Sequence, residues 1–209
     1  MGQGFEVLRK SMKLRITQTL LSSWLWVYKK DDGYAEFLST LRREPKKQTA
    51  AQLEGIRFEN VINNVLDGAP IDPKHEWLDV VLDITDELWG ASQQVTVFRE
   101  IEVQGVTFLL HGVLDFLKQG VIYDTKFSKR YEVGKYLDSP QTSMYFALVP
   151  EVRLFEYIIS DGKYVYREKY PRYLLGDGIE PIETTINNFM SFLDRQNLQD
   201  EFIKNWEVK

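Results

Sequence analysis

The sequence contains no cysteine, and its 209 residues include only two histidines. The absence of cysteine excludes disulfides, thiol catalysis, cysteine-ligated zinc and cysteine-held iron–sulfur clusters. The shortage of thiolate and imidazole ligands also argues against a cage for a transition metal. Carboxylate oxygens are the abundant ligands that remain, and they suit Mg²⁺ or Mn²⁺. Any bound metal is therefore expected to be one of these two ions.

Long apolar runs and a net positive charge are missing as well. No apolar run reaches membrane-spanning length, and Met1–Ser11 lacks the pattern of a signal peptide. These absences predict a soluble, cytoplasmic protein without a membrane contact. The formal net charge of -5 argues against a protein that coats nucleic acid, because such proteins are usually basic. It does not argue against an enzyme whose acidic side chains bind cations.

Helical periodicity dominates the first third of the sequence. Apolar positions predict helix over Ile16–Leu41, interrupted at Asp31-Asp32-Gly33. A Thr-x-x-Gln capping box predicts a further helix over Thr49–Gly68. The acidic stretch 69–89 contains two prolines and is expected to form a loop or a short helix.

From residue 94 onward, runs of β-branched and aromatic residues alternate with turn signals. Three strands in an antiparallel meander are the simplest interpretation of the first part, because short turns containing glycine separate them. A helix opened by Ser139-Pro140 follows, then a second hairpin and a final helix. The predicted ranges are Gln94–Val103, Val106–Leu117, Val121–Phe127, Gln141–Val149, Val152–Ser160, Lys163–Tyr170 and Pro181–Gln196.

This order of elements predicts an α/β fold of the mixed α+β kind, whose central sheet is mostly antiparallel to mixed and flanked by helices. The length suits one domain with a substantial core. We expect a single domain over 1–209, with an N-terminal helical part at 16–48, a core at 49–175 and a C-terminal helix at 176–209.

Two acidic residues and a lysine stand on neighbouring predicted strands. Asp124 and Lys126 are two residues apart on one strand, so their side chains point to the same face. Asp115 lies near the end of the preceding strand, and the short turn places it across from Asp124 to within about one residue of register. Cross-strand neighbours have Cβ atoms about 5 Å apart. Two carboxylates and an ammonium are therefore expected to converge.

The neighbours of these three residues are largely apolar, which makes the charges costly to bury. A charge inside an apolar strand is unfavourable unless a partner compensates it. Two adjacent carboxylates also repel each other, and this raises the proton affinity of one of them. A divalent metal between Asp115 and Asp124 resolves both problems, and Lys126 would then lie beside a water molecule bound to that metal.

Asp115, followed on the next strand by Asp124-Thr125-Lys126, resembles the signature of the PD-(D/E)XK nuclease superfamily. Gln141-x-x-x-Tyr145 on the following helix resembles the extra motif of its RecB-like and phage exonuclease branches. Gly55-x-x-x-Glu59 resembles the helical acidic motif of λ-type exonucleases, and 16–24 resembles the serine-rich first helix of RecB-like phage nucleases. The resemblance covers the chain from Ile16 to Tyr157, in the family's order of motifs.

The resemblance implies a restriction-endonuclease-like core and a deoxyribonuclease that depends on Mg²⁺ or Mn²⁺. A phage- or prophage-type exonuclease is the best match, acting in DNA recombination, repair or degradation in a bacterial or phage-infected cell. DNA is then the expected partner. Because λ-type exonucleases assemble as rings around DNA, the resemblance also leaves a homo-oligomer and a recombination-protein partner open.

The resemblance also implies a role for each residue of the motifs. Asp115, Asp124, the main-chain carbonyl of Thr125 and Glu59 would hold the metal. Lys126 would orient or help to deprotonate the attacking water and contact the scissile phosphate. Gln141 and Tyr145, one helical turn apart, would position Lys126, the water or the DNA backbone.

The same residues admit other interpretations. Asp115 and Lys126 could form an ion pair on a solvated face, and Glu59 could be exposed on an amphipathic helix. Gln141 and Tyr145 could serve packing and capping alone. A catalytically inert DNA-binding or interaction module, or a structure-specific endonuclease, is the alternative function.

Three further groups of residues call for an interpretation. His111, a lone histidine, is expected to be structural. The basic cluster at 42–47 suits a solvated face as well as a binding surface. The cluster at 126–130 adjoins the expected site and is predicted to contact phosphate.

Overall fold

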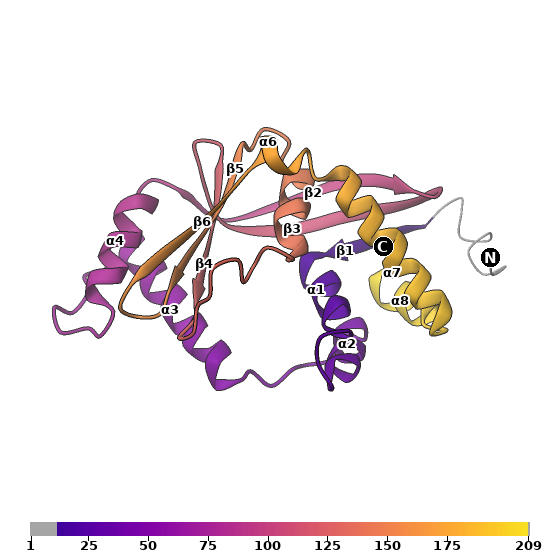
Figure 1. Ribbon diagram of the computed structural model, residues 1–209, viewed down its shortest axis with the longest axis horizontal. Coiled ribbons are helices and arrows are strands. Elements are labelled where there is room, and N and C mark those ends of the chain that lie inside the picture. The colour runs from indigo at the N-terminus through magenta and orange to yellow at the C-terminus, as the bar shows by residue number, and fades with distance from the viewer. Residues whose placement is uncertain (1–11, 209) are drawn as a thin grey trace.

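The computed structural model describes residues 12–208. Within that range a six-stranded sheet is flanked by helices (Figure 1), so the predicted mixed α/β fold is confirmed. The strands are β1 (Lys13–Thr17), β2 (Ser92–Val103), β3 (Val106–Lys118), β4 (Val121–Phe127), β5 (Leu154–Ser160) and β6 (Val165–Pro171). The helices are α1 (Gln18–Trp26), α2 (Gly33–Leu41), α3 (Ala50–Leu66), α4 (Leu78–Leu88), α5 (Pro140–Leu148), α6 (Arg172–Leu175), α7 (Ile179–Arg195) and α8 (Gln199–Trp206).

Strand β3 is the centre of the sheet. It pairs with β2 along one edge in antiparallel orientation, which confirms the first predicted hairpin. Its other edge is shared, because β1 pairs in parallel with its first part and β4 pairs antiparallel with its last three residues. The sheet continues through a parallel β4–β5 pair and an antiparallel β5–β6 pair, so it is mixed, as expected.

Two hydrophobic cores lie on opposite faces of the sheet. The larger core contains residues of α1, α2, α5, α7 and α8, whereas the smaller core lies beneath α3 and α4. On β5 the residues alternate between the two cores, since Tyr157 and Ile159 contact the larger one and Ile158 the smaller one. In Figure 1, β4 and the segment after it lie between α3 and α1.

The N-terminal part differs from the predicted helix that begins at Ile16. Lys13–Thr17 is a strand, in which Leu14 and Ile16 are buried and alternate with partly exposed residues. Five residues with period two are too few to stand out beside the helical pattern that follows. The helix begins at Gln18, after Thr17, whose hydroxyl accepts a hydrogen bond of 3.2 Å from the N–H of Leu20.

Two other segments hold more helix than the sequence predicted. The stretch 69–89 contains α4, a full helix of 11 residues with buried residues at helical spacing and acidic residues on its outer side. Region 176–209 contains two helices instead of one, because the chain turns at Asn197, which has a positive φ of 55°. The predicted capping box at Thr49 is present and opens α3.

Among residues 12–208, no helix combines the length and the apolar character needed to cross a membrane. The expectation for Met1–Ser11 concerns residues outside the described range.

Candidate active site

Asp115 and Asp124 lie at the point where β3 and β4 separate. The ladder between these strands ends at the pair Phe116 and Tyr123. One step further in the same register, Asp115 lies across from Asp124, as the sequence predicts. Asp124 is buried, with 2 % of its surface exposed. The first two predicted residues are therefore brought together at a fork in the sheet.

The β2–β3 ladder is interrupted at the same place. Gln94 lies opposite Asp115 in that register but forms no bridge, and its φ of 49° is left-handed. This conformation costs a non-glycine residue about 1–2 kcal/mol. Across the interruption, Leu114 contacts the larger core and Phe116 the smaller one, although residues two apart on a regular strand share a face. The interruption of the ladder therefore coincides with a change in side-chain direction along β3 at Asp115.

The carboxyl group of Asp115 has an unusual affinity for its proton. Burial, followed by the negative charge of Asp124, raises the pKa of Asp115 to about 8. Lys126 and a backbone hydrogen bond from Thr125 act in the opposite direction but do not prevent the shift. In the absence of a further cation, one of the two facing carboxyl groups therefore stays protonated at neutral pH.

Lys126 lies beside Asp124, with its Nζ atom 2.5 Å from Oδ2 of that residue. This contact is an ion pair by distance, but Oδ2 has no hydrogen-bond partner of adequate direction. Burial would lower the pKa of Lys126, and the charges of Asp124 and Asp115 outweigh it, so the pKa is raised. Lys126 is therefore a charged ammonium, and it compensates only one of the two acids.

Glu59, on α3, reaches the same group of charges. Burial raises the pKa of Glu59, and Lys126 and Asp124 are the next largest influences on it, in opposite directions. The Nε2 atom of Gln94 donates a hydrogen bond of 3.3 Å to Oε1 of Glu59. The left-handed residue of β2 therefore holds the third carboxylate, and nothing in the sequence pattern marked Gln94 for this position.

Gln141 and Tyr145, on α5, contact the site in different ways. Gln141 is buried, and its Nε2 atom donates a hydrogen bond to Oδ1 of Asp124. The hydroxyl of Tyr145 instead donates to the main-chain carbonyl of Val113, at 2.8 Å. Gln141 therefore orients a candidate ligand directly, whereas Tyr145 fixes the backbone of β3 two residues before Asp115.

A glycine allows α5 to approach β3 this closely. A Cβ atom at Gly112 would lie 2.8 Å from Cε1 of Tyr145 and 2.9 Å from Cδ1 of Leu148. Both distances are shorter than carbon atoms tolerate, so a larger residue here would force the Tyr145 ring and the Leu148 side chain to move.

Further aromatic and acidic residues support the site, and the sequence did not single them out. The hydroxyl of Tyr157 donates a hydrogen bond of 3.2 Å to Oε1 of Gln141, and the ring of Tyr136 stacks on Tyr157 at 4.7 Å. Glu168 accepts hydrogen bonds from the hydroxyl of Tyr131 and the N–H of Gly134. It thereby anchors the segment 128–139, which follows β4.

The two basic clusters have different surroundings. In the first cluster, Arg42 pairs with Glu201 at 2.7 Å and Arg43 lies over the ring of Trp206 at 4.3 Å. Both arginine side chains are therefore engaged in contacts within the protein. In the second, Lys129 pairs with Glu54 on α3 at 2.9 Å. His111 remains apart from the acidic group, and burial and Arg15 lower its pKa.

The donor set suits a divalent cation in its chemistry. Asp115, Asp124 and Glu59 supply carboxylate oxygens, and Oδ2 of Asp124 is buried without a hydrogen-bond donor. Thr125, the other predicted ligand residue, is buried, and its side chain points to the face of β4 opposite Asp124, so its main-chain carbonyl is the only candidate ligand atom that it offers. Within the described residues, however, no three acidic or histidine side chains form a ready-made metal group, and Lys126 occupies the position beside Asp124.

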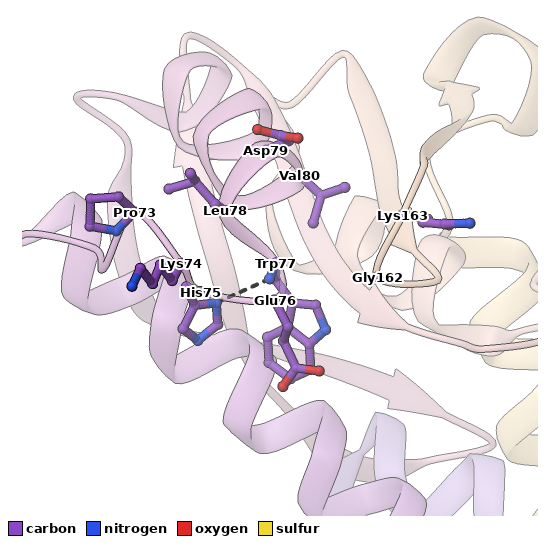
Figure 2. Close-up of a pocket in the computed structure, with 10 residues that line it drawn as sticks. All are labelled: Pro73, Lys74, His75, Glu76, Trp77, Leu78, Asp79, Val80, Gly162 and Lys163. Carbon is purple, nitrogen blue, oxygen red and sulfur yellow. Dashed lines mark hydrogen bonds between the residues drawn. The ribbon is translucent and has the colours of Figure 1, made fainter.

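A separate pocket, whose lining includes none of the candidate site residues, lies next to the start of α4 (Figure 2). His75 lines it, and its Nδ1 atom accepts a hydrogen bond of 3.1 Å from the N–H of Trp77. This histidine therefore holds the backbone that enters α4.

No protein-family model matches this chain, and no curated protein matches it. One solved structure, described as "Crystal structure of SSO0001", is similar with a TM-score of 0.46 and 16% sequence identity. The match covers 81% of this chain and 78% of that chain.

Proposed function

We propose that this protein is a metal-dependent nuclease that hydrolyses phosphodiester bonds in DNA. The observation that carries the proposal is the pair of facing carboxyl groups, Asp115 and Asp124, with the Lys126 ammonium and Glu59 around them. A raised pKa in a group of mutually repelling acids is typical of functional sites. The PD-(D/E)XK motif order supports the assignment of Mg²⁺ or Mn²⁺ as the cation.

The side chains divide the chemistry among them. Asp115, Asp124, Glu59 and the main-chain carbonyl of Thr125 would hold the metal, which would activate water and stabilise charge on the phosphate. Lys126 must release Asp124 when the metal binds, and its ammonium is then available to a phosphate oxygen. Lys126 would then orient the attacking water or help to deprotonate it, and contact the scissile phosphate. Gln141 keeps Asp124 in place.

Exonuclease action of the phage type, in the recombination, repair or degradation of DNA in the cytoplasm, is the specific form of the proposal. It rests on the order of motifs and implies products with 5′-phosphate ends. A recombination protein and further copies of this chain are the partners that such a role suggests.

End-labelled DNA tests the proposal. Linear duplex, linear single-stranded and closed circular DNA are each incubated with Mg²⁺, Mn²⁺ or EDTA. Lys126→Ala is compared with Lys74→Ala, a matched control at an exposed lysine that lines the pocket next to the start of α4. We expect metal-dependent loss of linear DNA, slowed about 100-fold or more by Lys126→Ala, because removal of one positioned transition-state contact has effects of that size.

Other outcomes change the assignment. Cutting of the closed circle would indicate an endonuclease. No metal-dependent cleavage of any substrate, with both variants binding DNA as the wild type does, would favour the inert DNA-binding module.

A further inference from the structure

A cleft adjoins the candidate active site on the side of α1. Its volume is about 370 Å³, and Lys126 and Gln141 belong to its lining. The lining also includes residues of α1 and of the segment that precedes α5, among them Trp26, Tyr136 and Ser139. A ligand in the cleft would therefore lie next to Lys126 and the candidate active site.

The lining of the cleft is positively charged, in contrast to the chain as a whole. Lys29, Lys126 and Lys135 belong to its lining, against the single acid Asp138, and Lys126 is already paired with Asp124 behind the lining. The formal net charge of the whole chain is -5. The one ion pair across the cleft joins Lys29 and Asp138 at 3.6 Å, and both side chains are exposed. Exposed pairs contribute little stability, so an incoming phosphate can take over Lys29.

An exposed tryptophan supplies a flat apolar surface in this cationic setting. Trp26 keeps 45% of its surface exposed, and the Nζ atoms of Lys29 and Lys30 lie 5.9 Å and 5.1 Å from its ring centroid. Tyr136 also lines the cleft, but one of its faces is already stacked on Tyr157. Trp26 is therefore the ring with most surface available to a flat ligand.

Hydrogen-bonding groups complete the cleft. Gln18 and Ser22, on successive turns of α1, hydrogen-bond to each other at 2.8 Å, and both belong to the lining. Such a pair can exchange its mutual bond for bonds to a polar ligand without leaving a buried group unsatisfied.

The dimensions favour a single strand over a duplex. Pockets of about 300–1,000 Å³ take small organic ligands, so this cleft has room for one nucleotide unit. A duplex would have to place both strands and their paired bases in this volume, which lies at the lower end of that range. In a duplex the faces of each base are covered by the neighbouring base pairs, whereas an unpaired base can present its face to an aromatic ring.

We propose that this cleft binds an unpaired nucleotide of a single-stranded DNA end, with its base stacked on Trp26 and its phosphates on Lys29 and Lys135. The inference rests on the proposed function, since the cleft would deliver the adjacent phosphate to Lys126. It makes the substrate class specific: a strand whose terminal nucleotides are not paired.

Binding without cleavage tests the inference. The anisotropy of a labelled 12-nucleotide oligothymidine and of a 12-base-pair duplex is measured with the whole protein in EDTA. Trp26→Ala is compared with Trp89→Ala, a control at a 64% exposed tryptophan that lies outside this cleft. We expect Trp26→Ala to weaken binding of the oligonucleotide about 5- to 100-fold, the range of base–aromatic stacking, and binding of the duplex less than about twofold. Trp26→Phe should retain most of the affinity, which separates stacking from misfolding.

The outcomes are distinguishable from failure of the proposed function. If Trp26→Ala and Trp89→Ala bind the oligonucleotide alike, or if Trp26→Ala weakens oligonucleotide and duplex equally, the inference is wrong even when metal-dependent cleavage is observed. If Trp26-dependent binding is present and no metal cleaves any DNA, the inference stands and the nuclease proposal fails.

Discussion

The pH dependence of stability follows from the carboxyl pair at the fork of β3 and β4. Burial and Asp124 raise the pKa of Asp115 to about 8, whereas an aspartate in the unfolded chain has a pKa of about 3.9. Between these values the folded protein keeps a proton that the unfolded chain has released. The free energy of unfolding therefore falls as pH rises, with a maximum slope of about 1.4 kcal/mol per pH unit for one proton.

The useful window runs from about pH 6.5 to 8, above the ordinary pKa of histidine. Over it, Asp115 retains most of its proton, so the metal-free protein should lose about 1.5 kcal/mol of stability. For a chain of this size that is about 3–6 °C in Tm. Asp115→Asn carries no titratable proton and should abolish this slope, whereas Asp86→Asn, at an exposed position of α4, should keep it.

Thermal unfolding by circular dichroism in EDTA, at several pH values, measures this effect. A wild-type stability that is constant or rises across the window would refute the reasoning. So would an Asp115→Asn variant that keeps the wild-type slope, because another group would then be responsible.

Three further predictions concern the groups around the pair. Gly112→Ala should lower the free energy of unfolding in urea by about 1–3 kcal/mol, because the new Cβ lies 2.8 Å from the Tyr145 ring. Gly55→Ala, where no atom lies within 4 Å, should be neutral or stabilising, and a similar loss in both variants would contradict the contact. Tyr145→Phe should cost about 0.5–1.5 kcal/mol through loss of the bond to Val113, and unchanged urea unfolding would contradict it. Glu168→Gln should speed hydrogen exchange at the amide of Gly134, measured by mass spectrometry, whereas Glu180→Gln should not.

Short-range patterns account for what could be predicted. The alternation of residues fixes the strands around Asp115, Asp124 and Lys126, and a turn of two residues between Lys118 and Val121 sets their register. The capping box at Thr49 is equally local. Such features depend on neighbours in the chain, so a single sequence reveals them.

The rest depends on contacts between distant elements. The hydrogen bond of Gln94 to Glu59 joins residues 35 positions apart. The backbone of Gln94 is left-handed although the residue is not glycine, so the sequence gives no sign of this conformation. The stack of Tyr136 on Tyr157 requires the segment after β4 to fold over β5. Strand β1 pairs in parallel with β3, some 90 residues later, and Leu14 forms a bridge with Glu207 near the other end of the chain. Hydrophobic periodicity and motif spacing do not predict any of these contacts between distant residues.

Binding of Mn²⁺, followed by electron paramagnetic resonance, tests the central claim most directly. The signal of free Mn²⁺ is titrated at pH 8 with the wild type, Asp124→Asn and the control Asp86→Asn. The account predicts that the wild type and the control bind Mn²⁺ alike and that Asp124→Asn weakens binding about 10-fold or more, since even residues behind the ligands have effects of that size. Equal binding by all three proteins, or no binding by any at millimolar Mn²⁺, would contradict a metal site at Asp115 and Asp124.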